Sequence, residues 1–294
     1  MVKIGMIGYN EGNGHPYSFS AIINGYNPSA METSPYPIIN KYLSERNKDE
    51  FGINDFKVTH IWTPNIFIAK NIAECTYIPN IVSDYRDFVG QVDAVIIARD
   101  DVDSHFELIN FFLKEKLLVF VDKPLCSSLK HLDFFMPYIE SAQLMSCSGL
   151  RYQPDIITFF DGKLKREDIC FVNTLSLLDW KKYGIHLLEA ITPIMGIDIK
   201  KVSNLNDKNN YIVKIEYYSG QYALIQINNN CINPMQAEFF TINESLKTIF
   251  NQNFVCFKTL LIEFSKMIKN KKAAINPMET YMIVKTIIEG EKYA

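Results

Sequence analysis

The sequence predicts an α/β protein whose first half folds as a doubly wound parallel sheet. Short apolar runs at residues 2–8, 92–98 and 118–121 alternate with stretches of helical or turn-like pattern, as consecutive βαβ units require. A turn rich in glycine follows the first of these runs. In open sheets of this kind, ligands collect at the carboxyl ends of the strands, so we searched those positions for functional residues.

The first strand leads into a turn with three glycines in seven residues. An apolar, helix-like run over residues 18–23 comes next, so backbone amides at a helix N-terminus could face a pyrophosphate. The spacing is loose, because a strict G-x-G-x-x-G would need glycine at Asn10 and Asn13, and an ordinary turn is the alternative. The candidate cofactor contacts in this turn are Gly8, Asn10, Gly12, Asn13, Gly14 and His15.

The second strand is expected over residues 57–62, after an insertion at about residues 27–56. A helix should follow over residues 66–75. An acidic residue at the end of this strand would suit the ribose of NAD, and an arginine would suit the phosphate of NADP. The sequence reads Thr63-Pro64-Asn65 instead, so Thr63 is a candidate contact but NAD and NADP are not distinguished.

A buried strand over residues 92–98 ends at a third group of candidate residues. Its continuous apolar run is typical of a strand covered on both faces. Asp103 can cap a helix that begins near Ser104. His105 lies in the first turn of that helix, where local packing is the alternative to a site role. The candidate cofactor contacts here are Ala98, Arg99, Asp100 and His105.

The strand over residues 118–121 ends in Asp122-Lys123-Pro124, which is the most informative segment of the chain. At this position of a doubly wound sheet, a lysine is presented beside a bound nicotinamide. A solvated lysine in a turn is the alternative. We therefore expect Asp122 and Lys123 to contact the cofactor and Lys123 to take part in catalysis.

Composition limits the other function classes. The chain has 294 residues, of which 48% are apolar and 21% charged, and a net charge of −3. There is no long basic stretch for nucleic acid, and no apolar run approaches the roughly 20 residues that span a bilayer. The six cysteines lack metal-site spacing, so we expect reduced core cysteines, no metal and a cytoplasmic protein.

The second half of the chain has a different pattern. Strands are expected at residues 144–149 and 169–178, and a hairpin at residues 211–218 and 221–227, joined by Ser219-Gly220. Two helices should finish the chain, the last with Asn276 as N-cap, Pro277 at its first position and Glu279 in a capping box. We expect a dinucleotide-binding domain over residues 1–124 and a second domain over residues 125–294.

These segments together resemble the glucose-fructose oxidoreductase, inositol dehydrogenase and rhizopine-catabolism (Gfo/Idh/MocA) family of NAD(P)-dependent oxidoreductases. The resemblance covers most of the chain. It rests on the strand ending at Gly8, the run Val-Asp-Ala-Val-Ile-Ile-Ala, the nearby His105, Asp122-Lys123-Pro124 in place of Glu-Lys-Pro, and Gly184-Ile185-His186-Leu187-Leu188-Glu189 in place of Gly-x-His-x-x-Asp. It implies a Rossmann domain followed by an α+β domain with an open, mainly antiparallel sheet for substrate binding and oligomerisation.

The resemblance also implies site residues. Lys123 and His186 match catalytic or substrate-binding positions, and Lys182, Tyr183 and Arg151 are candidate substrate contacts. Two features depart from the family and indicate a short, divergent member. The second domain looks brief, and Lys182 stands four residues before the histidine, where many members have an aspartate that would polarise it.

The expected reaction transfers a hydride between NAD or NADP and a hydroxyl or keto carbon of a sugar, sugar nucleotide or polyol, while Lys123 or His186 moves the hydroxyl proton. Two alternatives remain open. One is a regulatory protein that binds nucleotide without turnover, and the other is an epimerase or lyase with tightly held NAD. The exposed face of the second sheet favours a homodimer or homotetramer.

Overall fold

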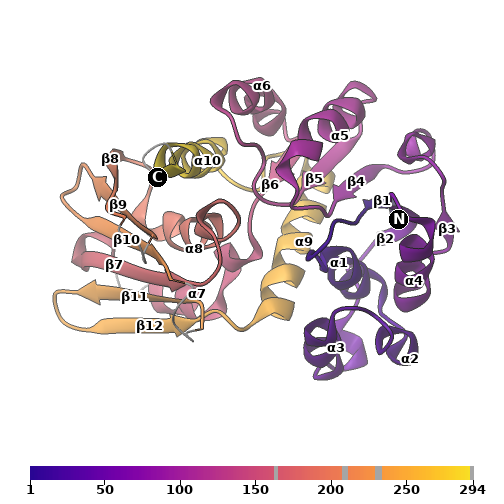
Figure 1. Ribbon diagram of the computed structural model, residues 1–294, viewed down its shortest axis with the longest axis horizontal. Coiled ribbons are helices and arrows are strands. Elements are labelled where there is room, and N and C mark those ends of the chain that lie inside the picture. The colour runs from indigo at the N-terminus through magenta and orange to yellow at the C-terminus, as the bar shows by residue number, and fades with distance from the viewer. Residues whose placement is uncertain (162–164, 207–210, 229–233, 292–294) are drawn as a thin grey trace. The chain divides into compact units, whose positions relative to one another are not determined.

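The protein was analysed as a computed structural model that describes residues 1–161, 165–206, 211–228 and 234–291 (Figure 1). The chain forms two compact units. The first contains Met1–Cys126, Phe134–Ser146 and Phe257–Ala274; the second contains Ser127–Asp133, Cys147–Cys256 and Ile275–Ala294. The first unit therefore includes segments beyond residue 124. The assignment of dinucleotide binding to residues 1–124 and of substrate binding to residues 125–294 stays a prediction.

The first unit is built on a six-stranded parallel sheet, which confirms the predicted Rossmann fold. The strand order is β3-β2-β1-β4-β5-β6, so the order reverses beside β1, as in dinucleotide-binding folds. Strands β1, β4 and β5 are almost wholly buried, which explains their continuous apolar sequences. The strands are β1 (Val2–Ile7), β2 (Phe56–Trp62), β3 (Asn80–Ile81), β4 (Ala94–Ile97), β5 (Leu118–Val121) and β6 (Leu144–Ser146).

Helices connect these strands. The insertion at residues 27–56 forms short helices with proline at their first turns, where a missing backbone N–H costs little. Helix α9 runs from the second unit into the first, where Phe264 packs against Phe56 and Phe120 with ring centroids 5.9 and 5.7 Å away. The helices are α1 (His15–Asn24), α2 (Pro28–Met31), α3 (Pro37–Ser44), α4 (Ile66–Thr76), α5 (Val102–Lys114), α6 (Leu129–Glu140) and α9 (Asn253–Asn270).

The second unit contains a six-stranded sheet with the order β12-β11-β7-β10-β9-β8 (Figure 1). Only β7 and β10 pair in parallel among the strands that the structure describes here; the other pairs are antiparallel, as expected. Side chains on β7 and β10 alternate between buried and partly exposed, so one face of the sheet is covered. The strands are β7 (Ile169–Ser176), β8 (Ile199–Asn204), β9 (Tyr211–Tyr217), β10 (Tyr222–Ile227), β11 (Gln236–Thr241) and β12 (Ser245–Ile249).

Helices α7 (Pro154–Phe160), α8 (Ile185–Met195) and α10 (Pro277–Glu291) belong to this unit. Trp180 is buried among them and donates its indole N–H to the carbonyl of Ile287 at 2.9 Å. The predicted start of α10 is confirmed, since the Asn276 side chain accepts the backbone N–H of Met278 at 3.1 Å. Glu279, expected in a capping box, has its carboxylate in contact with Arg151.

The five cysteines that the structure describes form no disulfide, and all but Cys170 are buried. Cys231 lies outside the described residues. Within the described ranges, no helix is long and apolar enough to span a membrane. The same ranges contain no group of three or more histidine, cysteine, aspartate or glutamate residues that could hold a metal ion.

Candidate functional site

The glycine-rich loop lies between β1 and α1, where its sequence predicts it. Gly12 has a positive φ of 84°, and no atom lies within 4 Å of the position that a Cβ would take. An open glycine backbone near the positive end of a helix dipole is suited to a pyrophosphate. The first turn of α1 has no acidic residue that would repel it. The loop therefore fits the phosphates of a dinucleotide.

The other two glycines of the loop serve packing. A Cβ on Gly8 would lie 2.7 Å from Pro16, so glycine allows the end of β1 to approach the first turn of α1. A Cβ on Gly14 would lie 2.5 Å from Ile39 and 2.9 Å from Tyr36, both in the insertion. Gly14 was predicted as a cofactor contact, and the structure gives it a packing role as well.

A buried hydrogen-bond network joins the loop to the Asp122-Lys123 segment. The Asp122 carboxylate accepts the side-chain N–H of Asn13 at 3.0 Å and contacts the ring Nδ1 of His15. Burial alone would raise the pKa of Asp122, but His15, Lys123 and Asn13 favour the ionised form and hold the pKa well below its usual range. Asp122 is therefore a carboxylate that fixes the loop and not a proton donor.

Lys123 is the next residue after this carboxylate, at the end of β5. It is 4% exposed, and its backbone N–H donates to Asp122 Oδ1 at 2.9 Å. A solvated turn lysine would be far more exposed, because ammonium groups are seldom buried. The structure therefore favours a functional or paired lysine over the solvated alternative.

The residues after β4 are tied to the same loop. Asn10 donates its amide to Asp100 Oδ1 at 2.5 Å and accepts the backbone N–H of Asp100 at 3.0 Å. Arg99 donates to the carbonyl of Tyr9 at 2.9 Å and pairs with Asp101. The predicted contacts Asn10, Arg99 and Asp100 thus lie together, while Ala98 is fully buried at the strand end.

His105 and Thr63 make local contacts. The ring of His105 is fully buried, with Nε2 at 2.9 Å from the carbonyl of Arg99 and Nδ1 at 3.3 Å from that of Leu125. The Thr63 hydroxyl donates to the carbonyl of Asn65 at 2.5 Å, and the Asn65 side chain caps α4. These contacts favour structural roles for both residues.

The second unit contains the predicted His186 on α8. Its Nδ1 lies 2.5 Å from Oγ of Ser148, which was not among the predicted site residues. Ser148 follows β6 and caps the short 3₁₀ helix Gly149–Tyr152 by accepting the N–H of Leu150 at 3.2 Å. The Tyr183 ring is tilted against the His186 ring, with centroids 5.5 Å apart.

Arg151 lies in a buried ion cluster. Its NH1 nitrogen is 2.9 Å from Glu189 on α8, and its NH2 nitrogen contacts Glu279 on α10. The Arg151 and Glu189 side chains are 8% and 2% exposed, and burial raises the pKa of Glu189 although Arg151 favours its charge. Since both terminal nitrogens have carboxylate partners, the contacts favour a structural role over the predicted substrate contact.

Lys182 lies in a π-helical turn, Trp180–Gly184, that precedes α8. The α-helix α8 begins directly after this turn, at Ile185. The side chain of Asp179 accepts the backbone N–H of Lys182 at 2.8 Å. Lys182 is partly buried, whereas the neighbouring Lys181 is exposed and pairs with Glu291. Single π turns often occur at functional sites.

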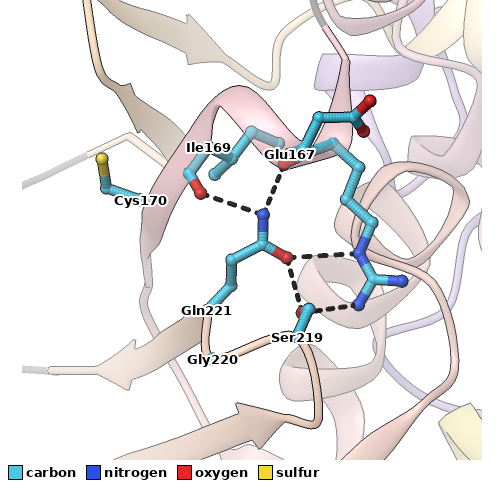
Figure 2. A pocket seen from close by; sticks show the side chains of 7 residues that line it. Glu167, Ile169, Cys170, Ser219, Gly220 and Gln221 are labelled. Atoms are coloured by element: carbon cyan, nitrogen blue, oxygen red, sulfur yellow. Dashed lines mark hydrogen bonds between the residues drawn. The ribbon is translucent and has the colours of Figure 1, made fainter.

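A hollow of about 480 Å³ in the second unit is lined by other residues (Figure 2). Figure 2 shows Gln221 donating to the carbonyl of Ile169 while its oxygen faces Ser219. Arg166 is held by Gln221 and Asp198. The side chains of Arg166, Ser219 and Gln221 bond to one another, and no predicted site residue lines this hollow.

Comparison with known proteins agrees with this architecture. Residues 38–147 match a family model described as an oxidoreductase family with an NAD-binding Rossmann fold. No curated protein matches the sequence significantly. The match over residues 38–147 supports NAD or NADP as the cofactor.

Solved structures share the fold at low identity. A myo-inositol 2-dehydrogenase from Lactobacillus plantarum has a TM-score of 0.75 at 14% identity, with 100% of this chain and 97% of that chain covered. A UDP-N-acetylglucosamine 3-dehydrogenase from Acidithiobacillus ferrooxidans has a TM-score of 0.74 at 11% identity, with the same coverage. A probable dehydrogenase from Thermotoga maritima has a TM-score of 0.73 at 14% identity, with 99% and 96% covered.

The chain thus spans nearly the whole length of these neighbours. Three observations indicate the same NAD-binding Rossmann fold. They are the parallel sheet with its glycine-rich loop, the Asp122-Lys123 segment at the end of β5, and the match over residues 38–147. Residues 38–147 of this chain thus match the oxidoreductase family with an NAD-binding Rossmann fold, and the chain as a whole shares its fold with the solved dehydrogenases.

Proposed function

We propose that the protein is an NAD(P)-dependent dehydrogenase that transfers a hydride between nicotinamide and a hydroxyl or keto carbon of a sugar, sugar nucleotide or polyol. The observation that carries this proposal is the Asp122 network. Because Asp122 bonds to Asn13 and contacts His15, the next residue, Lys123, lies at the strand end beside the glycine-rich loop. A lysine in this place can exchange a proton with the substrate oxygen while the cofactor takes or gives the hydride.

The chain's own residues would have distinct roles. Gly12 and the N-terminus of α1 would bind the pyrophosphate, and Asn10 with Arg99 would hold the loop against the end of β4. Lys123 and His186 are the residues that we assign to the substrate oxygen. Bound nicotinamide supplies only the hydride chemistry; the protein binds, orients and moves the proton.

A carbohydrate substrate is supported by the neighbours, whose names specify an inositol and a UDP-linked sugar. Lys182 supports an acidic group on that substrate, because its side chain is partly buried and carries an ammonium that attracts phosphate or carboxylate. Lys182→Met should then raise KM for the acidic substrate. Lys181→Met is the matched control, since Lys181 is exposed and pairs with Glu291, and it should change neither KM nor kcat. Equal effects of the two substitutions would contradict a role for Lys182.

A homo-oligomer is supported by the uncovered face of the second sheet. Phe171 stacks on Tyr222 and on Phe240 there, with ring centroids 5.1 and 4.4 Å away, and Leu175 and Leu224 are partly exposed beside them. A face of this kind is usually covered by a partner. Light scattering should report a homodimer or homotetramer, and Leu224→Lys should lower the mass; a monomeric wild type would contradict the proposal.

The decisive experiment is a titration of the purified protein with NAD and with NADP, followed by a screen of inositols, sugars and sugar nucleotides for change in nicotinamide absorbance. Free exchange of nucleotide with turnover would support the dehydrogenase. Tightly retained nucleotide without net turnover would instead indicate an internal redox cycle, and absence of nucleotide binding would refute the proposal. A cytoplasmic location remains a prediction.

A further inference from the structure

The hydroxyl of Ser148 contacts a ring nitrogen of His186. The family position that would provide a carboxylate to the histidine is Lys182, which cannot accept a hydrogen bond from an imidazole N–H. Ser148 Oγ lies 2.5 Å from His186 Nδ1, and the serine is 2% exposed. Water therefore has little access to this contact.

The backbone holds Ser148 in place. Its φ and ψ of −88° and 142° are those of an N-cap, and its Oγ accepts the N–H of Leu150. Its own backbone N–H donates to the carboxylate of Glu189. Glu189 lies one helical turn after His186 on α8, so the helix that presents the histidine also fixes the serine.

The ion cluster completes this arrangement. Arg151, three residues after Ser148, pairs with Glu189 at 2.9 Å and contacts Glu279 on α10. The glutamate of the Gly-x-His-x-x-Glu segment thus acts on the turn after β6. Through this turn it sets the position of the Ser148 hydroxyl relative to the imidazole.

A hydroxyl can form this hydrogen bond in either direction. Ser148 Oγ accepts one N–H, from Leu150, and keeps one lone pair and one proton, so it can accept from a protonated Nδ1 or donate to an unprotonated one. A carboxylate can only accept, so it would require a proton on the nitrogen that it faces. A serine hydroxyl that donates to Nδ1 leaves the proton of neutral histidine on Nε2.

We propose that Ser148 is a positioning residue that holds neutral His186 in the tautomer with its proton on Nε2. His186 then serves as a hydrogen-bond donor that orients and polarises the substrate oxygen, while Lys123 exchanges the proton. His186 keeps its own proton throughout, so no second base is required. The tautomer is independent of the proposed function, whereas the role in orienting substrate rests on it.

Nitrogen-15 NMR of the full-length protein, labelled at histidine, tests the tautomer without any substrate. At a pH where the imidazoles are neutral, wild-type His186 should show an unprotonated Nδ1 and a protonated Nε2, with signals assigned by their loss in His186→Gln. A protonated Nδ1 in the neutral wild type would overturn the proposal even if every Ser148 variant failed to fold.

Three variants refine the test. Ser148→Ala should remove the preference for one tautomer, and Ser148→Thr, which keeps a hydroxyl, should restore it. Ser146→Ala is the matched control, because Ser146 is also buried and lies two residues away; it should leave His186 unchanged. Unchanged His186 signals in a folded Ser148→Ala protein would overturn the proposal.

Once a substrate is in hand, Ser148→Ala should lower kcat by about tenfold while nucleotide affinity stays within about twofold, as expected for one oriented hydrogen bond. Ser148→Thr should recover most of that rate. The predicted tautomer without turnover on any carbohydrate would refute the proposed function and leave the Ser148 arrangement intact. An unchanged kcat in Ser148→Ala would refute the positioning role alone.

Discussion

Replacing Arg151 by methionine should destabilise the second unit strongly. The substitution keeps most of the side-chain volume but leaves Glu189, 2% exposed, without its cation partner. Breaking a buried pair from one side costs about 3–5 kcal/mol, because the remaining charge stays desolvated. For a unit of this size that corresponds to a fall of about 10 °C or more in the midpoint of thermal unfolding.

Tryptophan fluorescence can report this unit selectively. The chain has two tryptophans, so Trp180 is the only one left in a Trp62→Phe background. Trp180 is buried in the second unit and bonds to the carbonyl of Ile287, so its emission should change when the unit unfolds. Urea unfolding in this background, with equal slopes for each variant, gives the difference in free energy.

Two further variants make the result decisive. Arg166→Met removes an ion pair with Asp198 whose side chains are 30% and 39% exposed, so it should cost about 1 kcal/mol or less. Adding Glu189→Gln to Arg151→Met should restore about 2 kcal/mol, because the stranded charge is gone. The reasoning is refuted if Arg151→Met costs no more than Arg166→Met. A stable Arg151→Met protein with raised KM would instead support the predicted contact of Arg151 with the substrate.

Three more outcomes are expected. Lys123→Ala should lower kcat by ~10² to 10⁴ with nucleotide affinity nearly unchanged, as measured by steady-state kinetics and calorimetry, and a normal kcat would exclude Lys123 from catalysis. Gly12→Val should weaken nucleotide binding at least tenfold without loss of folding, since valine at φ 84° is strained and occupies the open approach to the loop; unchanged affinity would place the phosphates elsewhere. Asp122 has a lowered pKa, so its ionised form stabilises the fold above about pH 4 and this contribution is lost as pH falls further. Wild type should therefore lose more stability than Asp122→Asn between about pH 5 and pH 2 in urea titrations, and parallel losses would contradict the network.

Apolar periodicity was enough to predict the first sheet. Strands β4 and β5 are buried on both faces, and such strands read as continuous apolar runs that need no tertiary information. The run at residues 118–121 matches β5, whereas the runs at residues 2–8 and 92–98 extend past the ends of β1 and β4. The strand expected at residues 57–62 begins one residue after the start of β2, and the two-residue β3 was not predicted. The insertion at about residues 27–56 was predicted. Its short helices begin with proline, which marks both turns and first helical turns and so does not distinguish between them.

The second sheet was harder to predict. Strands β8, β11 and β12 lie at or near its edges and are short and rich in polar residues, so their patterns resemble loops. The parallel pairing of β7 with β10 joins residues about 50 positions apart and leaves no local signal. The strand expected over residues 144–149, among those of the second half of the chain, is β6 of the first sheet, and it ends at Ser146 because Ser148 caps a 3₁₀ turn.

The site residues also divide into those with a local sequence signal and those that only tertiary contacts reveal. Lys123 was found from its place after an apolar strand, which is a local property of the sequence. Ser148 was missed because serine is common and its partner, His186, is 38 residues away. The structural place of Arg151 was also hidden, since its partners Glu189 and Glu279 come from two helices that only the fold brings together.

The order of synthesis has a consequence for how this chain matures. The first unit needs Phe257–Ala274, which leave the ribosome after nearly all of the second unit. Until then Phe56 and Phe120 lack the Phe264 ring, and the carbonyl of Asn54 lacks the Lys269 ammonium. A nascent chain that ends at residue 146 therefore has every strand of its Rossmann sheet but an uncovered apolar surface. Such intermediates are prone to aggregate, so we expect chaperone contact during translation and insolubility of a fragment cut at that point.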